Sequence, residues 1–178
     1  MNILHLNTNY EMSTIYSNML YELNKIKNID GRLYYPVYEN KIIEDKNKGN
    51  VDTSKILNKN DKFFFFRRNK KLYKDVTRIY SLNRFDAIIA YSLFSNGYLA
   101  YTIKRKHNVP YIVIVQNTDI NMYFKKMIHL RKIGRKILND AQKIIFISKP
   151  YKELLLKKYI KNVDKEIINS KSEVIPFG

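Results

Sequence analysis

Residues 86–119 read DAIIAYSLFSNGYLAYTIKRKHNVPYIVIVQNTD, and the rest of the chain is interpreted outward from this segment. Residues 86–92 are a mostly apolar run, residues 98–107 have helical character, and residues 111–115 are β-branched and apolar on both faces. A strand that is apolar on both faces is typical of a buried parallel sheet. About 30 residues from strand to strand fit one βαβ unit, whose crossover is right-handed. The segment therefore predicts a parallel sheet whose strands end along one edge.

The same alternation of strands and helices extends to both ends of the chain. Further strands are expected at residues 2–6, 32–38, 143–147 and 173–175, and further helices at residues 12–26, 72–80, 121–139 and 148–159. Two stretches lack periodicity: a polar surface loop with a short helix near residues 54–57 is expected at residues 39–61, and a polar connection at residues 161–172. The predicted fold class is α/β: a Rossmann-like three-layer domain with a mostly parallel sheet and helices on both faces.

Composition excludes several kinds of site. The 178 residues, 45% of them hydrophobic, are enough for one domain with a core. The absence of cysteine excludes disulfides, thiolate metal sites and a cysteine nucleophile. His5, His107 and His129 do not have the spacing of metal ligands, so no metal site is predicted. No apolar run reaches the roughly 18 residues of a membrane-spanning helix, and no signal peptide is recognised, so a cytoplasmic location is expected.

The chain is strongly basic, with a net charge of +17 and a pI of about 9.8. Such a charge favours anionic partners, namely nucleic acid, phosphate-rich substrates or an acidic membrane. A general bias toward lysine, asparagine and isoleucine would produce the same charge without a function. Nucleic acid is disfavoured because helix-turn-helix, RNP-type and zinc patterns are absent from the sequence.

Four consecutive phenylalanines, residues 63–66, are followed at once by basic residues. One interpretation is a buried segment that leads into a core helix. Another is an aromatic and basic patch on an anionic membrane, at the inner face of the cell membrane. A third is a surface that stacks on single-stranded nucleic acid. The sequence leaves the three open, and the residues of the predicted membrane patch are Phe65, Phe66, Arg67, Arg68, Lys70 and Lys71.

Small polar residues follow several predicted strands. Because the carboxyl ends of parallel strands meet at one edge, where open sheets bind ligands, these residues form the predicted ligand site. Helix N-termini at the same edge offer N–H groups to anions. The sequence has no G-x-G-x-x-G after the first strand and no Walker A loop, which disfavours dinucleotide binding. The strand-end residues are Asn7, Thr8, Tyr91, Ser92, Gln116 to Asp119, Ser148, Phe177 and Gly178.

The order and spacing of these segments resemble the N-terminal domain of family-4-type glycosyltransferases. The resemblance covers nearly the whole chain and rests on residues 86–97, 109–119, 141–148 and 174–178. Such enzymes have the GT-B architecture, in which two Rossmann-like domains face each other across a cleft. The resemblance implies that residues 1–178 are a single acceptor-side domain. It also implies that the domain that binds the nucleotide-sugar donor, with its E-x7-E glutamate pair, lies outside this chain.

The resemblance also implies an activity. It would be metal-independent transfer of a sugar, with retention, from a nucleotide-sugar to a polysaccharide or lipid-linked glycan; this domain alone would hold no cofactor and be inactive. Gln116 to Asp119 matches the family's His-Gly-x-Asp segment, of which the aspartate is kept, so Asp119 is the expected catalytic residue. The expected acceptor-binding residues are Asn7, Thr8, Ser13, Tyr91, Ser92, Gln116, Asn117 and Thr118.

Two alternatives stay open. The first is a non-enzymatic basic module that binds nucleic acid or another polyanion, with an affinity that falls steeply with salt. The second is a stand-alone Rossmann-like domain with a complete small-molecule site. A last strand without a covering helix, at residues 173–175, disfavours the second.

Overall fold

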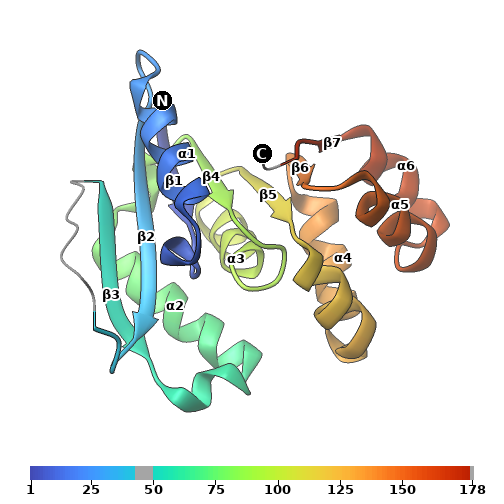
Figure 1. Ribbon diagram of the computed structural model, residues 1–178, viewed down its shortest axis with the longest axis horizontal. Coiled ribbons are helices and arrows are strands. Elements are labelled where there is room, and N and C mark those ends of the chain that lie inside the picture. The colour runs from blue at the N-terminus through green and yellow to red at the C-terminus, as the bar shows by residue number, and fades with distance from the viewer. Residues whose placement is uncertain (43–49, 177–178) are drawn as a thin grey trace.

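The computed structural model describes residues 1–42 and 50–176 (Figure 1). Seven strands form one sheet in the order β3-β2-β1-β4-β5-β6-β7, and every neighbouring pair is parallel. This arrangement confirms the predicted α/β, Rossmann-like fold. The strands are β1 (Asn2–Leu6), β2 (Asp30–Tyr38), β3 (Val51–Leu57), β4 (Ala87–Ala90), β5 (Tyr111–Val115), β6 (Lys143–Phe146) and β7 (Ser172–Val174).

Six α-helices and five short helical turns connect the described strands. The helices are α1 (Thr14–Lys25), α2 (Phe65–Ile79), α3 (Gly97–His107), α4 (Arg131–Asp140), α5 (Lys149–Lys158) and α6 (Asn162–Ser170). The short turns are η1 (Tyr10–Met12), η2 (Lys59–Lys62), η3 (Leu82–Arg84), η4 (Asp119–Phe124, a turn of π-helix) and η5 (Ile128–Leu130). None of the helices in this described part of the chain is long and apolar enough to cross a membrane.

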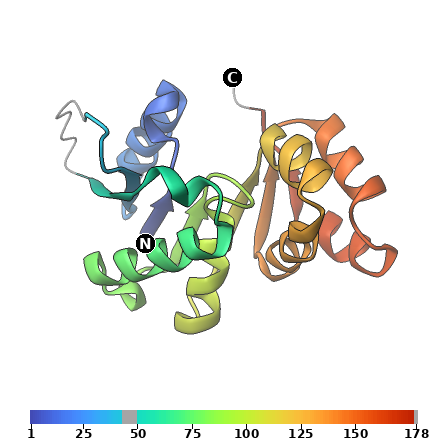
Figure 2. The ribbon, with the colours of Figure 1, turned by 90° about the horizontal axis from the view of Figure 1, so that it is seen from below.

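Helices cover both faces of the sheet, as predicted (Figure 2). Leu4 and Ile88 point to the face covered by α2, α3 and α4, where the largest hydrophobic core forms. Ile3 and Ile89 point to the opposite face, where they pack against α1. The strand side chains therefore alternate between two cores, and this explains why residues 111–115 are apolar on both faces.

Residues 51–57 form strand β3, so the prediction of a loop with a short helix was wrong there. The sequence VDTSKIL is polar because β3 lies at the edge of the sheet, where only Ser54 and Leu57 are buried. Polar edge strands hide the alternation that marks a buried strand. The part of the loop prediction that falls on residues 43–49 lies outside the described residues.

Two helix predictions also needed correction. Residues 162–170, expected to be a polar connection, form α6, whose inner side contributes Ile168 to the core. The continuous helix expected at residues 121–139 is broken into η4, η5 and α4. The break lies at Met127 and is stabilised by Arg131, whose Nε donates to the carbonyl oxygen of Phe124 at 2.6 Å.

Candidate functional site

The candidate site lies where the strand order reverses. β1 lies between β2 and β4, so the chain leaves β1 toward one side of the sheet and later returns on the other. In open parallel sheets, such a switch point opens a crevice at the carboxyl ends of the strands, where ligands bind. The predicted acceptor residues that follow β1, β4 and β5 all lie at this edge.

A buried hydrogen-bond network ties the loop after β1 to the loop after β4. The Thr8 amide donates to Asn96 Oδ1 at 3.2 Å, and Asn96 Nδ2 donates to Ser92 Oγ at 3.0 Å. Asn7 Oδ1 accepts from the Asn9 amide at 2.8 Å. Asn7, Ser92 and Asn96 are buried, so these three side chains form a polar layer beneath the two loops.

The Asp119 carboxylate joins the loops after β4 and β5. Its Oδ2 accepts from the Leu93 and Gln116 amides, both at 2.9 Å, and its Oδ1 accepts from the Phe94 amide at 3.1 Å. Burial raises the pKa of Asp119 to about 6, although the three N–H groups lower it. Asp119 is only 1% exposed, so its carboxylate is not presented to a ligand in this structure. These are the contacts of a positioning residue, and the predicted catalytic role stays a prediction.

A second polar chain runs beneath α1. His5 Nδ1 and the Tyr91 hydroxyl lie 2.9 Å apart, and Gln116 Nε2 donates to the Tyr91 carbonyl oxygen at 2.6 Å and to the Tyr16 hydroxyl at 3.0 Å. Burial lowers the pKa of His5 to about 4 and raises the pKa of Tyr91. Both side chains are therefore neutral near pH 7. The hydrogen bonds from Gln116 to Tyr91 and Tyr16 orient its side chain without the help of a charge.

The remaining predicted acceptor residues are accessible. Asn117 and Thr118 are exposed, and Thr8 and Gln116 are half-buried. Ser13 is half-buried, and its Oγ accepts from the Ile15 amide at 3.2 Å as the N-cap of α1. The accessible groups among the predicted acceptor residues are thus neutral amides and hydroxyls, which donate and accept hydrogen bonds.

Two further strand-end predictions have different outcomes. Ser148 takes the N-cap position of α5, but its side chain makes no capping hydrogen bond. Phe177 and Gly178 lie outside the described residues.

Sequence reasoning missed two residues of the site. Asn96 lies within residues 86–97 and is not among the predicted acceptor residues, yet its side chain links the two loops. Tyr16 lies in the helix expected at residues 12–26 and is not among the predicted acceptor residues, yet its hydroxyl accepts from Gln116 Nε2. Asn96 takes the N-cap position of α3 but makes no capping hydrogen bond, so its place before the helix does not predict the contact between the two loops.

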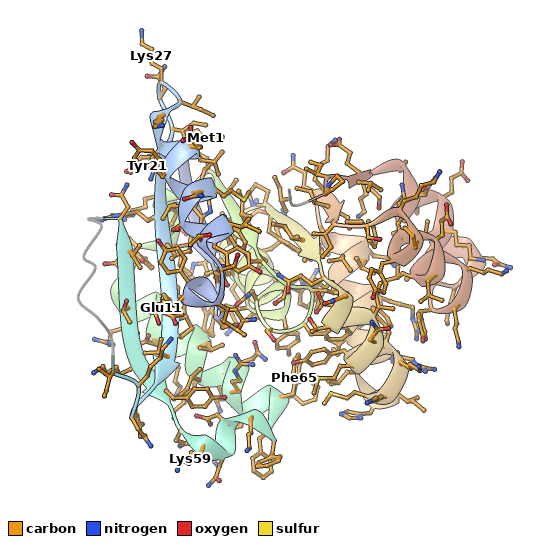
Figure 3. The ribbon with its side chains drawn as sticks, in the orientation of Figure 1. Met1, Glu11, Tyr21, Lys27, Lys59 and Phe65 are labelled. Carbon is orange, nitrogen blue, oxygen red and sulfur yellow. The ribbon has the colours of Figure 1, made fainter. Side chains whose placement is uncertain are left out.

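The structure divides the predicted membrane patch into inner and outer side chains. Phe65 points inward, toward the segment that contains η4, and its ring centroid lies 5.3 Å from that of Tyr98 (Figure 3). Phe66, Arg67 and Lys70 are exposed. The half-buried members are Arg68 and Lys71, and Lys71 Nζ lies 3.0 Å from Asp61 Oδ2.

The raised pKa of Asp119 predicts a pH-dependent stability. The carboxyl group ionises near 3.8 in the unfolded chain and near 6 in the folded chain. Between these values the folded state binds more protons, so this group lowers the free energy of unfolding as the pH rises from about 4 to about 6. The full difference is on the order of 3 kcal/mol. Asp119→Asn removes the titrating group and should lose this part of the pH dependence.

Urea unfolding of both proteins at about pH 4.5 and about pH 7.5 measures this contribution, since the other titrating groups are common to both. Only the difference between the two pH profiles is assigned to Asp119. Identical pH profiles for the two proteins would contradict the expectation.

Comparisons with known proteins identify the fold. No family model and no curated protein matches the chain. A sucrose-phosphate synthase from Thermosynechococcus elongatus aligns with a TM-score of 0.67 and 13% identity over 100% of this chain and 90% of that chain. The lipopolysaccharide outer core galactosyltransferase WaaB aligns with a TM-score of 0.63 and 17% identity, over 99% of this chain and 45% of WaaB.

A UDP-GlcNAc 2-epimerase from Neisseria meningitidis aligns with a TM-score of 0.62 and 12% identity, over 98% of this chain and 46% of the epimerase. This chain thus spans less than half of the galactosyltransferase and less than half of the epimerase. At these identities the likeness establishes the fold alone. The chain has the fold of one Rossmann-like domain of the GT-B type.

Proposed function

We propose that this chain is the acceptor-binding half of a glycosyltransferase that moves a sugar from a nucleotide-sugar to a polysaccharide or a lipid-linked glycan. The observation that carries the proposal is the carboxyl edge of the sheet at the switch point, where accessible neutral side chains lie above buried polar ones. Sugar hydroxyls both donate and accept hydrogen bonds, so amides and hydroxyls such as Gln116, Asn117 and Thr118 suit them.

The structural neighbours support this choice. One is named a galactosyltransferase of the lipopolysaccharide outer core, one a sucrose-phosphate synthase, and the epimerase was solved with UDP-GlcNAc bound. By analogy, the nucleotide-sugar donor binds to a second domain outside this chain, and residues 1–178 alone are inactive. Transfer proceeds with retention and without a metal ion, on the inner face of the cell membrane.

Within this proposal, Asp119 acts in catalysis through other residues. Its carboxylate fixes the Gln116 amide, and this contact sets the path of the loop that carries Asn117 and Thr118. Asn117, which is exposed, would contact the acceptor directly.

A glycan array probed with the purified chain tests the proposed function, together with calorimetry against UDP-glucose and GDP-mannose. Selective binding to some glycans and none to the two nucleotide-sugars is expected. Asn117→Ala should weaken glycan binding about fivefold without changing the thermal midpoint, since a lost hydrogen bond to a ligand is worth about 1 kcal/mol. The matched control is Asn18→Ala, on the exposed side of α1. Nucleotide-sugar binding by this chain, or equal effects of the two variants, would refute the proposal.

A further inference from the structure

Large apolar side chains are exposed on two segments of the chain that lie at the same side of the molecule. In the first segment, Phe63 is 72%, Phe64 is 54% and Phe66 is 53% exposed. In the second, Met122 is 47% and Ile128 is 65% exposed. We name the exposed side chains of residues 62–70 and 122–132 the aromatic–basic face. Contiguous exposed apolar surface of this kind marks an interaction site.

Phe65 connects the two segments of the aromatic–basic face. Its ring lies at the start of α2 (Figure 3), and its centroid is 6.5 Å from that of Tyr123 in η4. Tyr123 in turn stacks on Phe94 at 4.5 Å, with the rings 8° from parallel. The Phe94 amide donates to Asp119, so the face adjoins the loop that bounds the candidate acceptor site.

The charge of the aromatic–basic face has one sign. Residues 62–70 and 122–132 contain eight lysines and arginines and no aspartate or glutamate. The nearest carboxylates before each segment, Asp61 and Asp119, are each 1% exposed. Phenylalanine, methionine and isoleucine amid basic residues match the boundary between anionic headgroups and acyl chains. Met122 and Ile128 have no ring to stack on a base, which favours lipid over single-stranded nucleic acid.

The exposed phenylalanines are held on a fixed support. Asn58 and Asp61 form a reciprocal cap around η2: Asn58 Oδ1 accepts from the Asp61 amide at 3.2 Å, and Asp61 Oδ2 accepts from the Asn58 amide at 2.8 Å. Lys71 Nζ in α2 donates to the same Asp61 oxygen at 3.0 Å. These contacts fix the backbone on both sides of Phe63 and Phe64. The two rings are therefore already held in place, and binding to a partner does not cost the entropy of ordering this segment.

We propose that the aromatic–basic face rests on an anionic lipid bilayer, with the exposed apolar side chains at the acyl boundary and the lysines among the headgroups. The candidate acceptor site then lies beside the bilayer surface, where a lipid-linked acceptor is held. The choice of a lipid-linked over a free acceptor rests on the proposed function, whereas the bilayer contact does not.

Vesicle flotation with the purified chain tests the bilayer contact without any sugar transfer. The chain should bind vesicles of equal parts phosphatidylcholine and phosphatidylserine, and should bind pure phosphatidylcholine vesicles far more weakly. The double substitution Phe63→Ser and Phe64→Ser should weaken vesicle binding at least about tenfold. It removes two aromatic rings that would be transferred from water into the bilayer on binding. Serine at position 64 takes the N-cap of α2, where it is favoured, so folding is preserved.

A matched pair of charge variants locates the contact. Changing Lys70, Lys125 and Lys126 to glutamine should weaken binding to the anionic vesicles about a hundredfold. The same change at the exposed Lys27, Arg105 and Lys106 removes equal charge at the amino ends of β2 and β5, the edge of the sheet opposite the one that leads into the face, and should have little effect. Equal effects of the two sets, no vesicle binding, or tighter binding to a single-stranded oligonucleotide would each overturn the proposal. Failure of glycan binding alone would leave the bilayer contact standing.

Discussion

Asp119→Ala is expected to lower the free energy of unfolding by about 3 kcal/mol. The substitution leaves the amides of Leu93, Phe94 and Gln116 without their acceptor in the interior, and each unpaired buried N–H group costs about 1–3 kcal/mol. Removal of a buried charge offsets part of this loss. Urea unfolding at about pH 7 measures the change from the midpoint and the slope.

The control for Asp119→Ala is Asp86→Ala. Asp86 is also an aspartate beside β4, and its Oδ2 accepts from the Asn2 amide at 2.7 Å, but it is exposed. Water can replace that acceptor, so the loss should stay below about 1 kcal/mol. Equal losses for the two variants would show that the buried contacts of Asp119 do not stabilise the fold.

Gly134→Leu is expected to destabilise the chain by about 3 kcal/mol. A Cβ atom at position 134 of α4 would lie 2.6 Å from Phe94 Cζ and 2.8 Å from Phe124 Cζ, and both rings are fully buried. An added side chain in such a packed site forces shifts that cost about 1–3 kcal/mol or more. This outweighs the gain of about 1 kcal/mol that replacing a helical glycine usually brings.

Thermal unfolding of Gly134→Leu measures this effect. Lys132→Leu in the same helix is the control, because that position is exposed and should change stability little. Gly134→Ala should also destabilise, by less. A rise in the midpoint for Gly134→Ala would show that the two rings can move aside, and the packing argument would then fail.

The parts of the fold that the sequence predicted correctly are those whose residues are buried on both faces. The unit β4-α3-β5 could be identified because Ile88 and Ile114 each belong to unbroken apolar runs. β3 could not, because an edge strand buries few of its side chains. The break at Met127 depends on the Arg131 side chain, which donates to the Phe124 carbonyl oxygen seven residues earlier, and helical periodicity does not predict such a contact.

The site shows a similar limit. The edge of the sheet followed from the strand ends, but the direction of each loop side chain did not. Asn117 and Asp119 are two residues apart, yet one is exposed and the other is buried beneath the loop. The difference arises from amides of Leu93 and Phe94, which come from another loop of the chain. Such contacts between loops depend on the tertiary structure, so the spacing of residues in the sequence does not predict them.

The three amides that donate to the Asp119 carboxylate also determine whether a phosphate group can bind at this edge. Clusters of N–H groups beside a strand end are where many α/β proteins seat a nucleotide's phosphates. Here a tethered carboxylate already occupies three such donors, at an effective concentration that a free anion cannot match. These amides cannot bind a pyrophosphate group while Asp119 accepts from them, so any phosphate-bearing ligand would need other N–H groups. At this edge the three amides are therefore not available to an anion, which leaves the neutral side chains as the groups that a ligand can contact.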